Sequence, residues 1–355
     1  MSIRILVVDD SAFMRKAISM MLEEDPELEV IGTARDGLEA IDRVKELKPD
    51  LVTLDVEMPR MDGITALKKI MAENPLPVLM VSSLTIEGAR ATVEALSAGA
   101  VDFISKQTSY VSLDITKIKD DLISKIKAIT RNSTRIFSRA MTNKISTSKK
   151  RTSLMHSNVQ IVAIGVSTGG PFSLQKVIPS LPENFPLPVA IVQHMPPNFT
   201  KSLAERLDSI SRLEVCEAED GMELTRGKVF IAPGGLHLKF RRGPEKSAKV
   251  RVIVSKDPST SLHCPSVDVM FESANEVFGG RVLATVMTGM GKDGLEGAKL
   301  IKSAGGKVVA QDEETCVVYG MPKAIVDANL ADAVVPLEEI ASTITAAVSL
   351  SPEYA

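Results

Sequence analysis

The chain opens with Ile3-Arg4-Ile5-Leu6-Val7-Val8-Asp9-Asp10-Ser11, a run of strand-forming residues that ends abruptly at two aspartates. A short β-branched run that stops at polar residues is typical of a strand buried in a parallel sheet. An amphipathic helix pattern follows at once, over residues 11–24. Parallel strands need crossover connections, so this stretch predicts the first βα unit of an α/β fold.

Four more strand–helix pairs follow, which predicts a doubly wound, flavodoxin-like (βα)5 domain with helices on both faces of a parallel sheet. The expected strands are residues 3–8, 29–32, 51–54, 78–81 and 102–104, and the expected helices are 11–24, 36–47, 63–72, 86–97 and 115–129.

A second alternating series predicts a Rossmann-like, three-layer α/β/α domain with a hairpin-like insertion around residues 236–254. Its expected strands are residues 159–164, 189–192, 229–232, 250–254, 281–287 and 307–310, and its expected helices lie after Pro171 and over 200–207, 267–277 and 295–303.

Between the two series the apolar periodicity collapses into Ser, Thr, Lys and Arg. Such a composition buries too little apolar surface to offset the entropy of ordering the backbone. We therefore predict three segments: a first domain over residues 1–125, a flexible polar linker over 126–157 and a second domain over 158–350.

Composition excludes several classes of protein. A formal net charge of −3 gives no general attraction to nucleic acid or anionic lipid. No apolar run approaches the ~20 residues that span a bilayer, and no secretory signal opens the chain. Neither the three cysteines nor the four histidines have metal-ligand spacing. We expect a cytoplasmic monomer that binds no nucleic acid and does not insert into membranes.

Acidic residues gather where the strands of the first domain end. Asp9 and Asp10 follow the first strand and Asp55 follows the third, while Ser82 and Lys106 follow the fourth and fifth. Ligands of open α/β sheets bind at this edge, and converging carboxylates favour Mg²⁺, which prefers oxygen ligands. Any one acid could simply cap a helix. Helix capping explains the five residues together poorly.

The second domain begins with a G-x-S-x-G motif, Gly165-Val166-Ser167-Thr168-Gly169, between a strand and a helix. In that context a sharp turn exposes the serine as a nucleophile. His194 ends the next strand and could act as its base, and Asp293 follows a third strand and could orient the imidazole. A structural turn, a structural histidine and a helix N-cap are the respective alternatives.

A rival interpretation rests on Gly289-Met290-Gly291-Lys292-Asp293-Gly294, a literal G-x-G-x-x-G between strand and helix, with Asp312 after the next strand. This pattern is the fingerprint of dinucleotide-binding oxidoreductases. It leaves Ser167 and His194 unexplained, so it ranks second. A DNA-binding output domain ranks lower still, because basic and helix-turn-helix patterns are lacking.

The first domain closely resembles the receiver domain of two-component response regulators, over residues 1 to about 125. The resemblance is carried by Val7-Val8-Asp9-Asp10-Ser11, Asp55-Val56-Glu57-Met58-Pro59, Ser82-Ser83 and Lys106. It implies Asp55 as the phosphoacceptor, which needs Mg²⁺ for phosphorylation. The implied metal ligands are Asp9, Asp10, Asp55 and the backbone carbonyl of Glu57.

The same resemblance implies a phosphorylation-sensing switch. Ser82 would sense the phosphoryl group and Lys106 would pair with it. Phe103 stands where many receivers place a switch tyrosine.

The second domain resembles CheB-type chemotaxis methylesterases. The resemblance is carried by Gly165 through Gly170, Gln193-His194-Met195-Pro196-Pro197, Ile231-Ala232-Pro233-Gly234, Pro265-Ser266-Val267-Asp268 and Thr288 through Gly294. It implies Ser167 as nucleophile, His194 as general base and acid, Asp293 as orienting carboxylate, and backbone N–H groups of Thr168 and Met290 as the oxyanion hole.

The implied activity is protein-glutamate methylesterase and protein-glutamine deamidase. The family hydrolyses glutamate γ-methyl esters on methyl-accepting chemoreceptors with release of methanol, and deamidates receptor glutamines. No cofactor is expected for ester hydrolysis. A chemotaxis histidine kinase would phosphorylate Asp55 and thereby release inhibition by the receiver.

Overall fold

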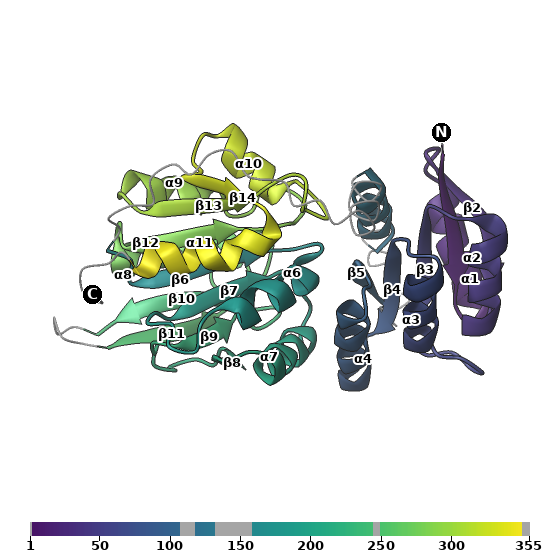
Figure 1. Ribbon diagram of the computed structural model, residues 1–355, viewed down its shortest axis with the longest axis horizontal. Coiled ribbons are helices and arrows are strands. Elements are labelled where there is room, and N and C mark those ends of the chain that lie inside the picture. Colours follow the sequence, from purple (N-terminus) through teal and green to yellow (C-terminus); the bar gives the residue numbers. More distant parts are fainter. Residues whose placement is uncertain (1, 107–117, 132–157, 244–248, 350–355) are drawn as a thin grey trace. The chain divides into compact units, whose positions relative to one another are not determined.

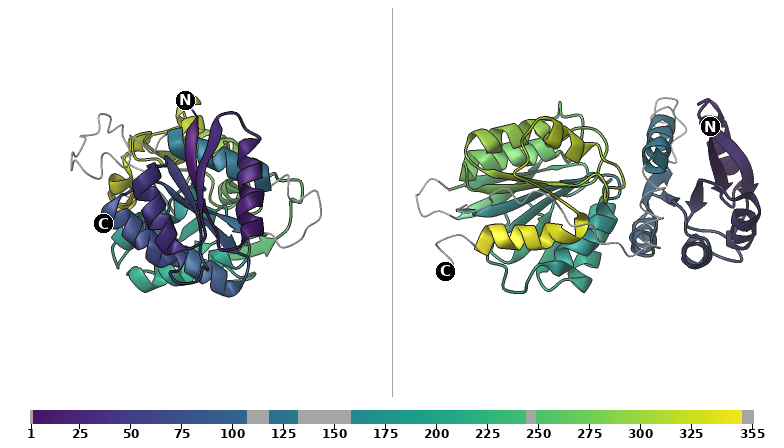
Figure 2. Two further views of the ribbon diagram at one scale, coloured as in Figure 1. Left: turned by 90° about the vertical axis from the view of Figure 1, so that its right-hand side faces the viewer. Right: turned by 45° about the horizontal axis from the view of Figure 1, so that its top comes forward.

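The computed structural model describes residues 2–106, 118–131, 158–243 and 249–349. The chain forms two compact units that divide between Lys144 and Ile145. Each unit is an α/β structure with its own sheet, and helices cover both faces of that sheet (Figures 1 and 2).

The first unit contains a five-stranded parallel sheet in the order β2-β1-β3-β4-β5. Its strands are β1 Ile3–Val8, β2 Leu28–Ala34, β3 Leu51–Asp55, β4 Val78–Ser83 and β5 Asp102–Lys106. Its labelled helices are α1 Ala12–Glu23, α2 Gly37–Leu47, α3 Gly63–Glu73 and α4 Ile86–Ser97. The predicted (βα)5 fold is confirmed.

The N-terminal ends of these four helices are capped by side chains, as their sequences suggest. Ser11, Asp36, Asp62 and Thr85 each accept a hydrogen bond from a backbone N–H of the first turn. Such caps satisfy donors that the helix itself leaves unpaired. These caps fix the residue at which each helix begins after its strand, and therefore where the residues at the strand ends lie.

A further helix occupies residues 118–131 and packs through buried Ile126 and Ile129. Lys127 on this helix pairs with Asp25 just after α1, at 2.9 Å between Nζ and Oδ2. Residues 126–131 of the predicted linker are therefore helical, because their apolar positions keep helical spacing and find a core. The rest of the predicted linker lies outside the described residues.

The second unit contains a seven-stranded parallel sheet in the order β14-β13-β12-β6-β7-β9-β8, with a separate antiparallel hairpin, β10-β11. The strands are β6 Ile161–Val166, β7 Val189–Gln193, β8 Glu214–Glu217, β9 Lys228–Ile231, β10 His237–Arg242, β11 Val250–Ser255, β12 Val282–Val286, β13 Lys307–Gln311 and β14 Ala333–Val335. The predicted three-layer fold with a hairpin insertion is confirmed.

Helices cover both faces of this sheet. They are α6 Gly170–Val177, the 3-10 turn η1 Ile178–Ser180, α7 Phe199–Ile210, α8 Val267–Phe278, α9 Leu295–Ser303, α10 Met321–Asp327 and α11 Leu337–Ser349. One core lies under α8 and α9 and includes the fully buried Phe230 and Phe271. Helices α6, α7 and α11 pack together on the other side.

Four elements of this unit were missed by the sequence pattern. Strands β8 and β14 are only four and three residues long, too short to show a period of two. Helix α10 has seven residues and includes a proline in its first turn, and α11 lies close to the C-terminal end of the described residues.

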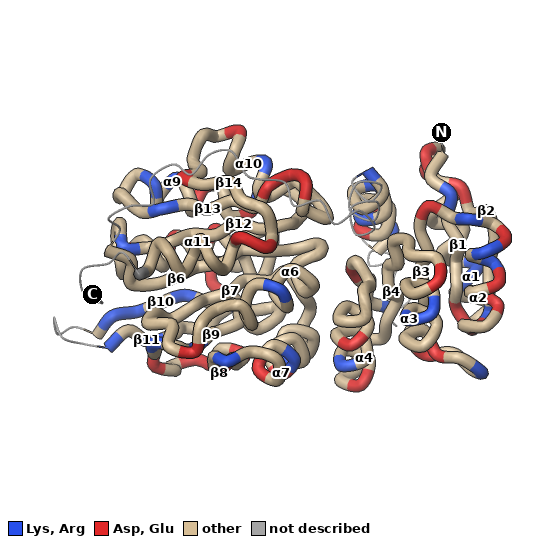
Figure 3. Tube along the Cα trace, in the orientation of Figure 1, with Lys and Arg blue, Asp and Glu red and all other residues tan. Residues whose placement is uncertain are grey.

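Acidic and basic residues are interspersed over both units, as the charge-coloured trace in Figure 3 shows. Within the described residues, no helix combines the length and the apolar character needed to cross a membrane.

Candidate active site

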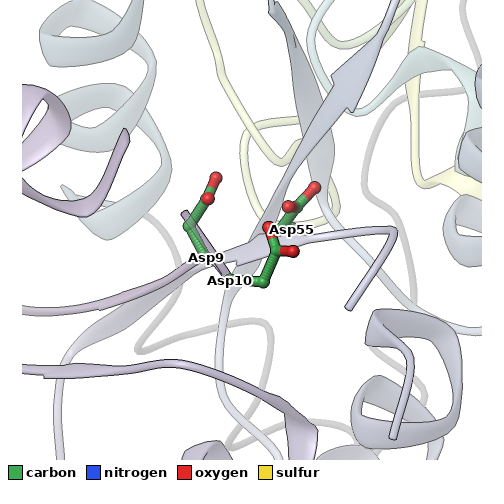
Figure 4. Close-up of side chains that lie close together, drawn as sticks. All are labelled: Asp9, Asp10 and Asp55. Atoms are coloured by element: carbon green, nitrogen blue, oxygen red, sulfur yellow. The ribbon is translucent and has the colours of Figure 1, made fainter. Parts of the chain in front are cut away.

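The first unit brings three carboxylates together at the carboxyl edge of its sheet. Strand β1 lies between β2 and β3, so the direction of winding reverses there and the loops after β1 and β3 diverge. Asp9 and Asp10 after β1 and Asp55 at the end of β3 offer oxygens within 4.8 Å of one another (Figure 4). Asp9 and Asp55 are buried, and Asp10 is exposed.

A lysine from the fifth strand reaches the same carboxylates. Lys106 Nζ lies 2.8 Å from Asp9 Oδ2 and 2.7 Å from Asp55 Oδ2. Burial raises the pKa of Asp55 to about 6, although its hydrogen bond with Lys106 works against that rise. Asp55 therefore lies in a partly desolvated carboxylate cluster that a fixed cation balances only in part.

The other predicted receiver residues flank this cluster. Ser82 at the end of β4 is buried, and its hydroxyl donates to the Gly88 carbonyl at 3.1 Å. Phe103 in β5 is also buried, and the ammonium of Lys125 lies 5.6 Å from its ring centroid. Glu57, in contrast, exposes its side chain just beyond β3.

The second unit has its own reversal of winding, between the neighbouring strands β6 and β12. Ser167 follows β6, His194 follows β7, and Asp293 lies in the loop after β12. The three predicted triad residues therefore gather at one carboxyl edge, where α/β sheets bind ligands. This placement follows from the sheet order alone.

The Ser167 backbone is held tightly between neighbouring strands. Its N–H donates to the Thr288 carbonyl at 3.0 Å, and its carbonyl accepts from the Gln193 side-chain amide at 3.0 Å. Gly289 makes this approach possible, because a Cβ there would lie 2.8 Å from the Ser167 Cβ. The nucleophile candidate thus sits on a fixed turn that depends on a glycine from the loop after β12.

His194 and Asp293 are in direct polar contact. His194 Nε2 lies 2.8 Å from Asp293 Oδ2, and both side chains are largely shielded from solvent. Burial alone would raise the pKa of Asp293, but the hydrogen bond and charge of His194, together with backbone donors, outweigh it and hold that pKa well below its usual range. Asp293 is therefore ionised and fixes the Nε2–H tautomer of His194.

Asp293 is held by the N-terminus of a helix that precedes it in sequence by about 25 residues. Its carboxylate accepts from Ser266 Oγ at 2.9 Å, from the Val267 N–H at 2.7 Å and from the Asp268 N–H at 2.9 Å. These are the N-cap and first turn of α8, where the helix dipole favours negative charge. The N-cap alternative for Asp293 is wrong for its own helix, because Gly294 occupies that position in α9.

Asp268 makes the reverse contact. Its carboxylate accepts from the Gly297 N–H of α9 at 2.7 Å. Burial, followed by the nearby charge of Asp293, raises the pKa of Asp268 to about 6 in spite of the backbone donors. The N-terminus of each of the helices α8 and α9 therefore donates hydrogen bonds to a carboxylate that lies at the start of the other helix.

Two backbone amides near Ser167 have no protein acceptor among the residues that the structure describes. Within the described residues, the N–H groups of Thr168 and Met290 donate no hydrogen bond to protein, and the Ser167 hydroxyl makes none to His194. Thr168 is otherwise anchored, since its carbonyl accepts from Thr288 Oγ1 at 2.9 Å. Both amides are thus available where the oxyanion hole is predicted.

Sequence reasoning missed three supports of this site. His263 stacks on His194 with ring centroids 4.4 Å apart and planes 18° from parallel. Gln193 anchors the Ser167 carbonyl, and Ser266 anchors Asp293. Only Ser266 carries a sequence signal, a serine directly before an apolar helix pattern with an acid in the first turn, which is typical of an N-cap.

Two of the three glycines in the rival dinucleotide fingerprint serve the packing of the unit, whereas a Cβ on Gly291 would meet nothing within 4 Å. Gly289 lies against Ser167, and Gly294 lies against Val267 of α8. Asp312 is engaged in a local turn, where its Oδ1 accepts from the Thr315 hydroxyl at 2.6 Å.

Two family models match the chain: CheB methylesterase over residues 162–344 and response regulator receiver domain over residues 5–115. Among curated proteins, the protein-glutamate methylesterase/protein-glutamine glutaminase of Lawsonia intracellularis is 50% identical, with 97% of this chain and 99% of the relative covered. Protein-glutamate methylesterase/protein-glutamine glutaminase 1 of Oleidesulfovibrio alaskensis is 49% identical, with 98% of this chain and 99% of the relative covered.

A solved structure is also similar. The crystal structure of the Thermotoga maritima CheB methylesterase catalytic domain matches with a TM-score of 0.51 and 48% identity, covering 53% of this chain and 98% of that chain. These matches support the ester hydrolase interpretation and give no support to the dinucleotide-binding alternative. The chain belongs to the CheB methylesterase family and carries a response regulator receiver domain ahead of the methylesterase domain.

Proposed function

We propose that this chain is a phosphorylation-activated protein-glutamate methylesterase. Its substrates are γ-methyl esters of glutamate on methyl-accepting chemoreceptors, which it hydrolyses to glutamate and methanol during chemotactic adaptation. The same site deamidates receptor glutamines, because both reactions pass through a tetrahedral oxyanion. The observation that carries the proposal is the 2.8 Å contact between His194 and an Asp293 carboxylate held by three further donors.

In the proposed reaction Ser167 Oγ attacks the γ-carbonyl carbon of the ester. Because Asp293 engages Nε2 of His194, the nitrogen left to take the hydroxyl proton is Nδ1. The tetrahedral intermediate expels methoxide, which takes the proton from His194 and leaves as methanol. A water molecule then attacks the γ-glutamyl ester of Ser167, His194 accepts its proton and returns it to Oγ, and glutamate is released.

Negative charge that develops on the carbonyl oxygen needs donors already in place. We assign that role to the backbone N–H groups of Thr168 and Met290, which make no hydrogen bond to protein within the described residues. Met290 directly follows Gly289, whose backbone lies against Ser167. Donors that need no rearrangement during the reaction stabilise the transition state most effectively.

For the receiver we propose Asp55 as the phosphoacceptor, with a chemotaxis histidine kinase as phosphodonor. The clustered carboxylates of Asp9, Asp10 and Asp55 supply the oxygen donors that Mg²⁺ prefers, and the Glu57 carbonyl would complete the protein ligands. Bound Mg²⁺ would neutralise charge on the transferring phosphoryl group. Lys106 already reaches Asp55 and would pair with the phosphoryl oxygens.

Ser82 would then sense the phosphoryl group, and the buried Phe103 would occupy the switch position. The added charge at Asp55 favours the active form of the enzyme. We further propose a cytoplasmic monomer with a receiver over residues 1–125 that is extended by the helix at residues 118–131, a linker that ends at residue 157, a catalytic domain over 158–350, and no cofactor for ester hydrolysis.

The decisive experiment measures methanol release from methylated receptor membranes, with and without a small phosphodonor and Mg²⁺. Ser167→Ala should lower the rate by on the order of 10⁴ to 10⁶. Cys264→Ala is the matched control, because Cys264 lies beside His263 in the same region yet has no proposed role. Near-native hydrolysis by Ser167→Ala, with activity lost in Cys264→Ala, would refute the serine mechanism.

Activation is tested in the same assay. Phosphodonor should raise the rate of the wild-type chain and leave Asp55→Asn at its basal rate. Methanol release that rises equally in both proteins would exclude Asp55 as the phosphoacceptor.

A further inference from the structure

A second imidazole lies face to face with the proposed base. The rings of His263 and His194 are stacked, with centroids 4.4 Å apart and planes 18° from parallel. His194 keeps one edge on Asp293 through Nε2. The carboxylate of Asp293 therefore fixes the His194 ring within its plane, and the stacked His263 ring opposes its rotation out of that plane.

The stacked ring and the carboxylate's donors come from one short segment. His263 is followed after two residues by Ser266, Val267 and Asp268, which supply the three donors to Asp293. Ser266 is itself held, since its N–H donates to the buried Nδ1 of His237 at 3.2 Å. Residues 263–268 thus support both members of the His194–Asp293 pair.

The charge state of His263 matters because His194 becomes positively charged when it takes the serine proton. Burial lowers the pKa of His263, and the charge of His194 lowers it further, while Asp293 works the other way. Among the residues that the structure describes, His194 and Asp293 are the ionisable side chains whose charges act on the pKa of His263. A neutral ring presents an electron-rich face to a stacked cation, which attracts it, whereas a second imidazolium would repel it.

We propose that His263 is a positioning residue that holds the His194 ring in its reactive orientation and stabilises it when protonated, through its aromatic face alone. This inference rests on the proposed esterase function. It assigns no proton transfer to His263, so its ring nitrogens are dispensable. This positioning role differs from that of a proton relay, in which a second histidine would accept the proton from His194 and pass it onward.

Three variants in the full chain separate these roles. His263→Phe keeps a flat ring and cannot titrate, His263→Leu keeps bulk without an aromatic face, and His263→Ala removes both. With phosphodonor present, His263→Phe should retain kcat within about threefold, whereas Leu and Ala should lower kcat by about tenfold, the scale of one aromatic contact. KM should be unchanged in all three, because the ring acts on the proton-transfer step.

Contrary outcomes are equally distinct. A His263→Phe variant as impaired as His263→Ala would mean that a ring nitrogen is required, and the proposal would fail. Wild-type kcat in His263→Ala would also overturn it. A fall in kcat accompanied by an equal fall in the melting temperature of all three variants would assign His263 to folding of the loop instead.

A second measurement does not depend on esterase activity. In the Ser167→Ala background, the stacked ring should shift the His194 Hε1 and Hδ2 proton resonances upfield. That shift should persist in His263→Phe and disappear in His263→Leu. If neither the wild type nor any His263 variant hydrolyses the ester while the ring-current shift behaves as expected, the proposed function is wrong but the stacking is supported. Loss of the shift in His263→Phe would contradict the stacking.

Discussion

Asp293 and Asp268 each accept hydrogen bonds from the N-terminus of a helix, and in each case it is the helix next to the other residue. Asp293, just before α9, accepts from the first turn of α8, and Asp268, in the first turn of α8, accepts from the first turn of α9. The exchange serves both helices at once. It also brings two acids together, and they respond oppositely, with the pKa of Asp293 lowered and that of Asp268 raised.

The raised pKa of Asp268, about 6 against 3.8 in the unfolded chain, predicts that its ionised form lowers stability. The contribution of protonated Asp268 to the free energy of unfolding is fully present below pH 4 and is lost as the pH rises through about 6. Asp268→Asn should therefore raise the free energy of unfolding by about 1 kcal/mol at pH 8, a value discounted for solvent screening of a partly exposed group.

Urea unfolding at pH 8 and pH 4 tests this expectation, with Glu272→Gln, an exposed acid on the same helix, as control. The gain in Asp268→Asn should vanish at pH 4. An equal gain at both pH values would contradict an ionisation effect.

His237 predicts a second pH dependence, of opposite sign. Its buried ring accepts the Ser266 N–H at Nδ1 and faces the Pro258 carbonyl with Nε2, so it must be neutral. Burial lowers its pKa below 6.5, so the folded state binds fewer protons than the unfolded state and loses stability as pH falls below about 6.5. His237→Gln should lower the melting temperature at pH 8 yet flatten its decline between pH 7 and pH 5.5, measured by calorimetry. An undiminished decline would exclude His237 as its source.

Most of the fold, and the gathering of Ser167, His194 and Asp293 at one edge of the sheet, could be predicted from sequence for one shared reason. Buried parallel strands appear as short apolar runs, and the residues that end them gather at one edge of the sheet. Ser167, His194 and Asp293 were found because each directly follows such a run or lies in the loop after it. Knowledge of the loop conformations was not needed for this.

What sequence could not give is how the site is supported. The hold of α8 on Asp293 joins residues about 25 apart through packing, and no local pattern encodes it. His263 lies in a segment without helical or strand periodicity, so its stacking on His194 left no signal. Asp293 even carried a misleading one, because its position suggested a cap for α9.

Gly289 predicts a steric test of the nucleophile turn. A Cβ at this position would lie 2.8 Å from the Ser167 Cβ and closer still to the Met321 sulfur. Gly289→Ala should therefore displace Ser167 and reduce kcat/KM for ester hydrolysis by on the order of 10²-fold. Gly221→Ala is the control, since a Cβ there meets nothing within 4 Å although φ is +81°. Comparable losses in both variants would show that general destabilisation, not contact with Ser167, is responsible.

The carboxylate cluster of the receiver predicts stabilisation by Mg²⁺. A ligand at 100 times its dissociation constant adds about 2.7 kcal/mol to the free energy of unfolding. The melting temperature of the first unit should rise with Mg²⁺ in the wild-type chain and rise far less in Asp10→Asn, which removes one carboxylate. Glu57→Gln should respond like the wild type, because only its backbone carbonyl is assigned to the metal. A full Mg²⁺ response in Asp10→Asn would place the metal elsewhere.

The dependence of Asp293 on donors in α8 also has a consequence during synthesis, because the two segments emerge from the ribosome at different times. Domains fold as they leave the ribosome, N-terminal ones first. The donors at residues 266–268 emerge before the acid at 293 that they hold, and Ser167 and His194 emerge earlier still. The proposed catalytic pair of His194 and Asp293 therefore cannot form until translation has passed residue 293, by which time the receiver ahead of it has been made. The nascent protein therefore acquires its regulator before it acquires the hydrolytic activity to be regulated.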